Sequence, residues 1–167
     1  MLPLAHVTLA AVSLVLGAFV FLNTKGTWQH RCVGTLYCAS MVGLDLAALG
    51  IYNLTGHFNF FHFTAILSLA MVLMGWSQVL FRRRLRNWLY RHYVYMCWSY
   101  VALVAASLNE GFVRLSPLKA LVRRTGNWVI ITTQVVLLCA AALLIKHKKA
   151  RMLARYGNFK PPNFESG

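Results

Sequence analysis

Apolar residues run along this chain in five long blocks that are separated by short polar stretches. A helix that crosses the hydrocarbon core of a membrane needs about 20 mostly apolar residues. Blocks of this length occupy residues 2–22, 32–52, 61–81, 92–113 and 127–145. Because backbone groups in lipid must bond within their own segment, and because membrane barrels use shorter alternating strands, each block is expected to be a helix. The pattern predicts an all-α integral membrane helical bundle with five transmembrane helices.

The composition agrees with this class, and the connections divide the chain into four parts. Apolar residues make up 59% of the 167 residues and charged residues 12%, which is unusual for a soluble domain. We expect a four-helix membrane core over 1–113 and an outer loop over 114–126 that can form a short interfacial helix. A fifth transmembrane helix over 127–146 and a basic cytoplasmic tail over 147–167 complete the chain.

The distribution of the 17 Lys and Arg residues predicts the orientation. They gather in the first and third connections and in the tail, whereas the last connection between helices carries Arg114, Lys119, Arg123 and Arg124. Since cytoplasmic loops are rich in Lys and Arg, we expect the N-terminus outside and the C-terminus in the cytoplasm of a bacterial inner membrane. The charges adjoin helix ends and form no soluble basic domain. They therefore fit anionic lipids at the cytoplasmic face better than nucleic acid.

Each of the first four spans carries one histidine near its beginning: His6, His30, His62 and His92. Because successive spans run in opposite directions, we expect His6 and His62 near the outer face and His30 and His92 near the inner face. A titratable side chain at membrane depth is costly unless it meets a partner or a cavity. Two histidine pairs, one in each leaflet, therefore indicate functional sites.

Paired histidines on different helices match the chemistry of haem. The iron of a porphyrin has two axial positions on opposite faces, and two imidazoles can fill them. Aromatic residues around His62 and His92 offer flat apolar walls. At the inner site the stretch KGTWQHR supplies Lys25, Thr27 and Arg31 as partners for the haem propionates. This predicts two haem b groups, with one histidine pair as the iron ligands of each.

Two other interpretations stay open. A zinc or copper site, in a metal-binding membrane protein or a hydrolase, could draw its ligands from residues of the outer face: His6, His57, His62, Asn59, Asp45 and Glu110. Asp45 and Glu110 are the acidic residues that precede the tail, and either could instead pair with Arg114. In the third interpretation the protein is a non-catalytic assembly or interaction subunit, and the histidines only hold helices together.

The motif KGTxxHRxxGxxY extends from Lys25 to Tyr37. Together with the histidines that open the first, third and fourth spans, it resembles a family of bacterial membrane proteins of unknown function. The resemblance covers about residues 1–110, and the fifth span and the tail lie outside it. It supports the four-helix unit and the choice of histidines, and it implies no reaction.

A looser likeness, in arrangement alone, is to the ascorbate-reducible transmembrane cytochromes b. In those proteins paired histidines on alternating helices hold one haem near each membrane face. The likeness implies that electrons cross the membrane, and that the donor is a quinol or a small reductant. The function expected from the sequence is therefore that of a b-type di-haem electron-transfer protein or membrane reductase.

Overall fold

The computed structural model describes residues 2–51, 56–57, 60–82, 84–85 and 87–156, and all regular secondary structure in these residues is helical. The helices of this part of the chain are α1 (Leu2–Leu22), α2 (Trp28–Leu49), α3 (Phe60–Leu80), α4 (Trp88–Arg114), α5 (Ser116–Thr125) and α6 (Trp128–Tyr156). All except α5 are long and apolar enough to cross a membrane. The prediction of an all-α membrane bundle with five spanning helices is confirmed.

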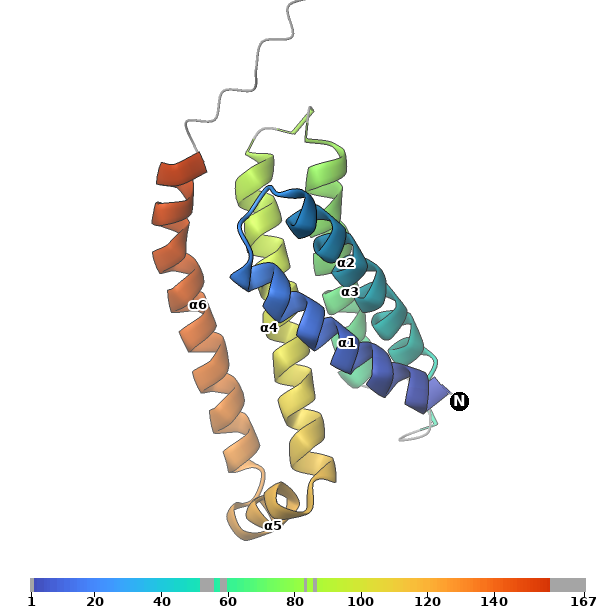
Figure 1. Cartoon of the computed structure of the whole chain (residues 1–167). Coiled ribbons are helices and arrows are strands. Elements are labelled where there is room, and N and C mark those ends of the chain that lie inside the picture. The colour runs from blue at the N-terminus through green and yellow to red at the C-terminus, as the bar shows by residue number, and fades with distance from the viewer. Residues whose placement is uncertain (1, 52–55, 58–59, 83, 86, 157–167) are drawn as a thin grey trace, which may run out of the picture.

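Helices α1 to α4 form a bundle in which helices that follow one another in sequence pack side by side (Figure 1). Helix α2 packs between α1 and α3, and α4 packs against both α3 and α1. Among the described residues, no Cα of α1 lies within 8 Å of α3, and no Cα of α2 lies within 8 Å of α4. Helix α1 is therefore diagonally opposite α3, and α2 is diagonally opposite α4.

Helix α6 lies outside this bundle and packs against α4, at the left of Figure 1. The Gln134 amide donates a hydrogen bond to the carbonyl of Ala105 at 2.9 Å, and the Lys149 ammonium lies 4.5 Å from the centre of the Tyr90 ring. Helix α5 falls within the loop expected over 114–126 and connects α4 to α6. The fifth spanning helix continues to Tyr156, so the first part of the expected tail is helical.

Two helices begin about one turn before the apolar blocks that predicted them. Helix α2 begins at Trp28 and α4 begins at Trp88, whereas the blocks begin at 32 and 92. Hydropathy detects only the segment that suits hydrocarbon, and the aromatic and polar residues at a membrane interface can continue the same helix. His30 and His92 consequently lie within the first two turns of their helices.

The core of the bundle is formed by buried side chains of α2, α3 and α4: Tyr37, Cys38, Met41, Leu44, Val72 and Leu103. Side chains of α4 pack against two glycines, Gly17 of α1 and Gly75 of α3. A Cβ atom on Gly17 would overlap the ring of Tyr100, and one on Gly75 would lie 2.6 Å from Sδ of Met96. Small residues let neighbouring helices approach closely where no hydrophobic effect between helices assists packing.

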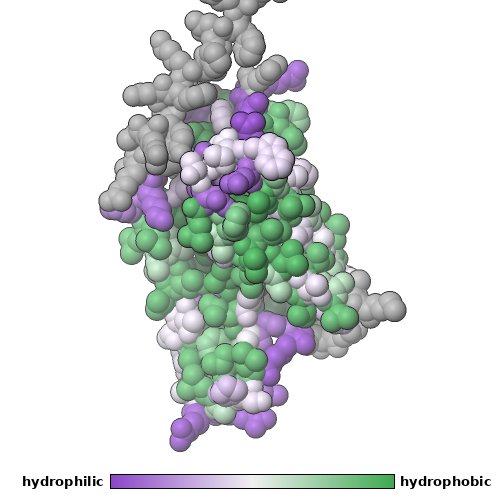
Figure 2. All heavy atoms as spheres, viewed as in Figure 1, coloured by the Kyte–Doolittle hydropathy of each residue, from purple (hydrophilic) through white to green (hydrophobic). Residues whose placement is uncertain are grey.

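The outer surface of the bundle is apolar in its middle. Figure 2 shows a band of hydrophobic residues between hydrophilic residues at the two ends of the molecule. Large exposed side chains in the spanning helices include Val15, Phe19, Leu67, Val136 and Leu143. Such a surface would be costly in water and suits contact with lipid.

Candidate functional site

The stretch KGTWQHR forms the short connection between α1 and α2, and its first residues have local structural roles. The Lys25 ammonium donates hydrogen bonds to three backbone carbonyls at the end of α1, at 2.6, 2.9 and 3.1 Å. Gly26 has a φ of +83°, which glycine adopts without steric cost. The Thr27 hydroxyl accepts a hydrogen bond from the backbone N–H of His30 at 3.2 Å and caps α2. These contacts fix His30 as the third residue of α2.

The four histidines lie in two pairs at opposite ends of the bundle. His6 and His62 begin α1 and α3 at one end, which we call the His6 end, and His30 and His92 begin α2 and α4 at the other, the His30 end (Figure 1). In each pair, one histidine is the third residue of its helix and the other is the fifth. His62 is 2% exposed, and the other three are half-buried. Both histidines of each pair therefore belong to diagonally opposite helices.

The ring of His92 is oriented by a hydrogen bond to the neighbouring helix α3. Its Nδ1 lies 2.8 Å from the carbonyl oxygen of Gly75 on α3. A carbonyl oxygen can only accept, so Nδ1 carries the proton and donates it. This tautomer leaves the lone pair on Nε2, the arrangement that orients histidines which bind a metal.

Open space adjoins α2 at Gly34, near His30. The Nδ1 atoms of His30 and His6 are buried and have no hydrogen-bond partner among the described residues. Gly34 lies one turn after His30, on the face of α2 that carries Tyr37 and Met41, and a Cβ atom on Gly34 would meet no other atom within 4 Å. A buried imidazole nitrogen without a partner is costly and calls for an explanation.

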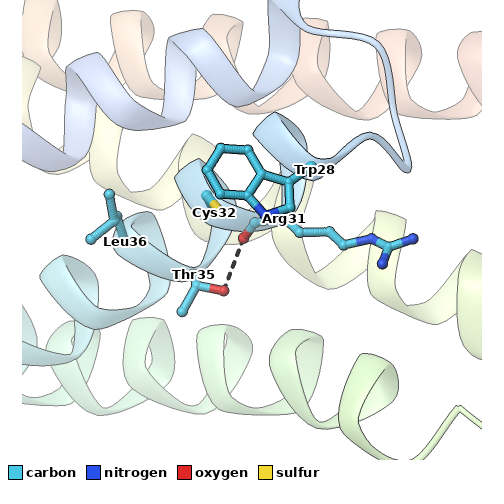
Figure 3. A pocket seen from close by; sticks show the side chains of 5 residues that line it. All are labelled: Trp28, Arg31, Cys32, Thr35 and Leu36. Carbon is cyan, nitrogen blue, oxygen red and sulfur yellow. Dashed lines mark hydrogen bonds between the residues drawn. The ribbon is translucent and has the colours of Figure 1, made fainter.

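Charged and titratable groups around His30 come from α2, from α4 and from the connection between α1 and α2. Lys25, Arg31 and His92 all lie within electrostatic range of the His30 imidazole. Lys25 already bonds three carbonyls, so a propionate would compete with these bonds. Arg31 lies on the other side of α2, where it lines an open groove of about 500 Å³ with Trp28, Cys32, Thr35 and Leu36 (Figure 3).

Among the described residues, those expected to form a zinc or copper site do not gather into a set of metal ligands. Within the described ranges, no three His, Cys, Asp or Glu residues are placed so that they could hold a metal ion. Glu110 forms an ion pair with Arg114 one turn later in α4, as the alternative interpretation expected. His57 is exposed, and Asn59 lies outside the described residues.

The chain matches a family model that is described as a predicted membrane protein (DUF2306), over residues 3–146. The chain belongs to this family. The match shows that α5 and most of α6 are part of the family unit, so the prediction that the resemblance ends near residue 110 was wrong. No curated protein and no solved structure matches the chain. The likeness to transmembrane cytochromes b therefore stays a prediction from arrangement.

Hydroxyl groups deep in this DUF2306 protein were not identified from the sequence. Ser13 donates a hydrogen bond to Ser40 at 2.8 Å, which links α1 to α2, and Tyr37 bonds Ser99 at 3.0 Å, which links α2 to α4. Tyr100 donates to the carbonyl of Leu14 at 3.2 Å. The spacing of Tyr37 and Ser40 in an apolar block was the available signal, because polar groups in lipid must find partners inside the bundle.

Proposed function

We propose that this protein is an integral membrane b-type electron-transfer protein that binds two haem groups, one at each end of the bundle. His6 and His62 would be the iron ligands at one end, and His30 and His92 those at the other. The observation that carries the proposal is that each pair lies at one end on diagonally opposite helices. A bis-histidine haem supplies one-electron transfer, and the protein's part is to hold and orient its ligands.

The diagonal placement favours haem over simple helix-to-helix bonding. Two axial imidazoles must approach a macrocycle from opposite faces, so their helices need a separation that the macrocycle can fill. Each pair joins helices that have no Cα atoms within 8 Å of each other among the described residues, so the two imidazoles come from helices that are not in close backbone contact. Histidines that served only as glue would be expected to bond a neighbouring helix, as His92 does with the Gly75 carbonyl of α3, whereas His30 Nδ1 has no such partner among the described residues.

The groups at the His30 end fit an iron-binding site. The Gly75 carbonyl holds His92 in the tautomer that presents Nε2, and the Nδ1 of His30 is buried without a partner among the described residues. The space around Gly34, one turn after His30, is open. Arg31 and Lys25 would meet propionates only at the rim of the bundle.

The orientation follows from the charges on the two ends. The Lys and Arg residues concentrate at the His30 end, in the connections before α2 and α4 and in the last turns of α6. We therefore place the His30 end at the cytoplasmic face of a bacterial inner membrane, beside anionic lipids, and the His6 end outside. The electron donor would be a quinol or a small reductant.

An optical spectrum of the purified protein tests this proposal. The protein is expressed with added haem and measured oxidised and then dithionite-reduced, beside His6→Leu, His30→Leu and a matched control, His147→Leu. His147 is an exposed residue of α6 outside both pairs. We expect sharp low-spin haem bands, about half of the bound haem in each of the first two variants, and an unchanged spectrum in the control.

The alternatives give different results in the same samples. A featureless spectrum from well-folded protein would refute the haem proposal. Bound zinc or copper in elemental analysis would then indicate a metal-binding protein. If neither haem nor metal is found, the assembly subunit is favoured. Equal haem loss in all three variants would indicate non-specific haem adsorption.

A further inference from the structure

A single carboxyl group is buried in the half of the bundle nearest the His6 end. Asp45 lies on the buried face of α2, and its side chain is 5% exposed. The Ser68 hydroxyl of α3 lies beside this carboxyl, whereas Oδ2 is buried and has no hydrogen-bond partner in the described part of the chain. With about 1.5 Å of rise per residue, Asp45 lies about 7 Å along the axis from Gly50 at the end of α2.

The helices packed against α2 carry no Lys or Arg that could balance a charge on Asp45. The sequence has none before Lys25 and none between Arg31 and Arg82. Helices α1 and α3, which pack against α2, therefore carry no such residue, and neither does the connection from α2 to α3. Arg31 begins α2 at the opposite end, about 21 Å along the axis from Asp45 at 1.5 Å per residue.

Other titratable groups near Asp45 are few. His6 is the titratable residue of α1, and His62 is that of α3; both lie toward the His6 end. On α2 itself Tyr37 lies within electrostatic range of Asp45, and Cys38 is buried nearby on the same face. The Tyr37 hydroxyl is already bonded to Ser99.

We propose that Asp45 is a proton-binding site inside the membrane, a carboxylic acid that carries its proton at neutral pH. Removing an ion from water into the bundle costs several kcal/mol unless an opposite charge accompanies it, whereas a neutral acid avoids most of this cost. The proton resides on the carboxyl, beside the Ser68 hydroxyl. The ligand of the site is a proton, taken up or released as one H⁺ per Asp45. This inference does not depend on haem binding.

The sequence allows a direct test, because Asp45 is the only aspartate in the chain. Cell-free synthesis with aspartate that carries ¹³C in its side-chain carboxyl marks this residue alone, in the wild-type protein. Infrared spectra of the protein in lipid vesicles at neutral pH, labelled minus unlabelled, then report the state of Asp45. We expect the isotope to shift the carbonyl stretch of a protonated acid, and this band to convert to carboxylate bands when the pH is raised.

Two further samples complete the test. In Asp45→Asn the protonated-acid band should be lost completely. In Glu110→Gln, which removes an exposed, ion-paired carboxylate, the band should be unchanged. Carboxylate bands from the labelled wild-type protein at neutral pH would overturn the proposal, and that reading needs no variant that might fail to fold.

Discussion

Alanine in place of Gly17 would disturb the packing of α1 against α4. A Cβ atom at this position would overlap the Tyr100 ring and lie 3.1 Å from Cε2 of Tyr37. The Tyr100 ring cannot yield as a flexible side chain would, because its hydroxyl bonds the carbonyl of Leu14 and the ring packs 5.1 Å from Phe21. Gly34 on α2 is the matched control, since a Cβ atom there meets nothing within 4 Å.

The structure predicts effects of opposite sign for the same chemical change. Glycine to alanine inside a helix gains about 0.5–1 kcal/mol. At Gly17 this gain is opposed by overpacking of about 1–3 kcal/mol and by loss of a hydrogen bond worth about 1 kcal/mol. Gly17→Ala should therefore lower the free energy of unfolding by about 2 kcal/mol, whereas Gly34→Ala should raise it by about 0.5–1 kcal/mol.

The free energy of unfolding can be measured by titrating dodecyl sulfate into detergent micelles and following tryptophan fluorescence. The informative quantity is the difference in the free energy of unfolding between the two variants, because both values share the same error of extrapolation. If Gly17→Ala were as stable as Gly34→Ala, Tyr100 would not pack against α1. The placement of α1 beside α4 would then be wrong, and the diagonal assignment of the histidine pairs would lose its basis.

Three smaller effects can be measured in the same way. Thr27→Ala removes the cap of α2 and should cost about 1 kcal/mol, whereas Thr27→Ser should retain stability; equal values would show that the cap does not form. Tyr37→Phe should cost about 0.5–1.5 kcal/mol because the bond to Ser99 is lost, and no change would contradict that buried bond. Lys149→Ala removes the cation over Tyr90, about 0.5–1 kcal/mol, and should speed proteolysis of the end of α6; an unchanged cleavage rate would contradict this contact.

The sequence predicted the helices well, because an apolar run long enough to cross lipid is a strong local signal. It misplaced the beginnings of α2 and α4 because Trp28, Gln29, Trp88 and Tyr90 are not apolar enough for a hydropathy window but remain helical. The packing partners of each helix could not be read from the pattern. They depend on which large side chain packs against which small residue, as Tyr100 packs against Gly17.

The alternation of spans was sufficient to predict that the histidines share ends in pairs, since it needs only the direction of each helix. The diagonal relation was not predictable, because it depends on α4 closing the bundle against α1. The role of Lys25 was also beyond the sequence. A cation beside a histidine suggests an anionic ligand, and only the structure reveals three carbonyls as its partners.

The motif KGTxxHRxxGxxY can now be divided into residues that the fold explains and residues that it does not. Local folding accounts for Lys25, Gly26 and Thr27. Contacts of the described chain give His30 and Gly34 no comparable role, since His30 Nδ1 has no partner there and the space beside Gly34 is open. These two residues lie one turn apart on the same face of α2. The haem proposed for the His30 end would bind beside them.

Gly34→Leu tests this conclusion, because leucine extends into the space that is open around a Cβ atom at this position. The variant should fold with a free energy of unfolding close to that of Gly34→Ala. If a macrocycle occupies this space, the variant should retain about half of the bound haem, and a second substitution, His30→Leu, should remove no more. Full haem binding by a folded Gly34→Leu variant would show that the space is not used. Further loss in the double variant would place the haem elsewhere around His30.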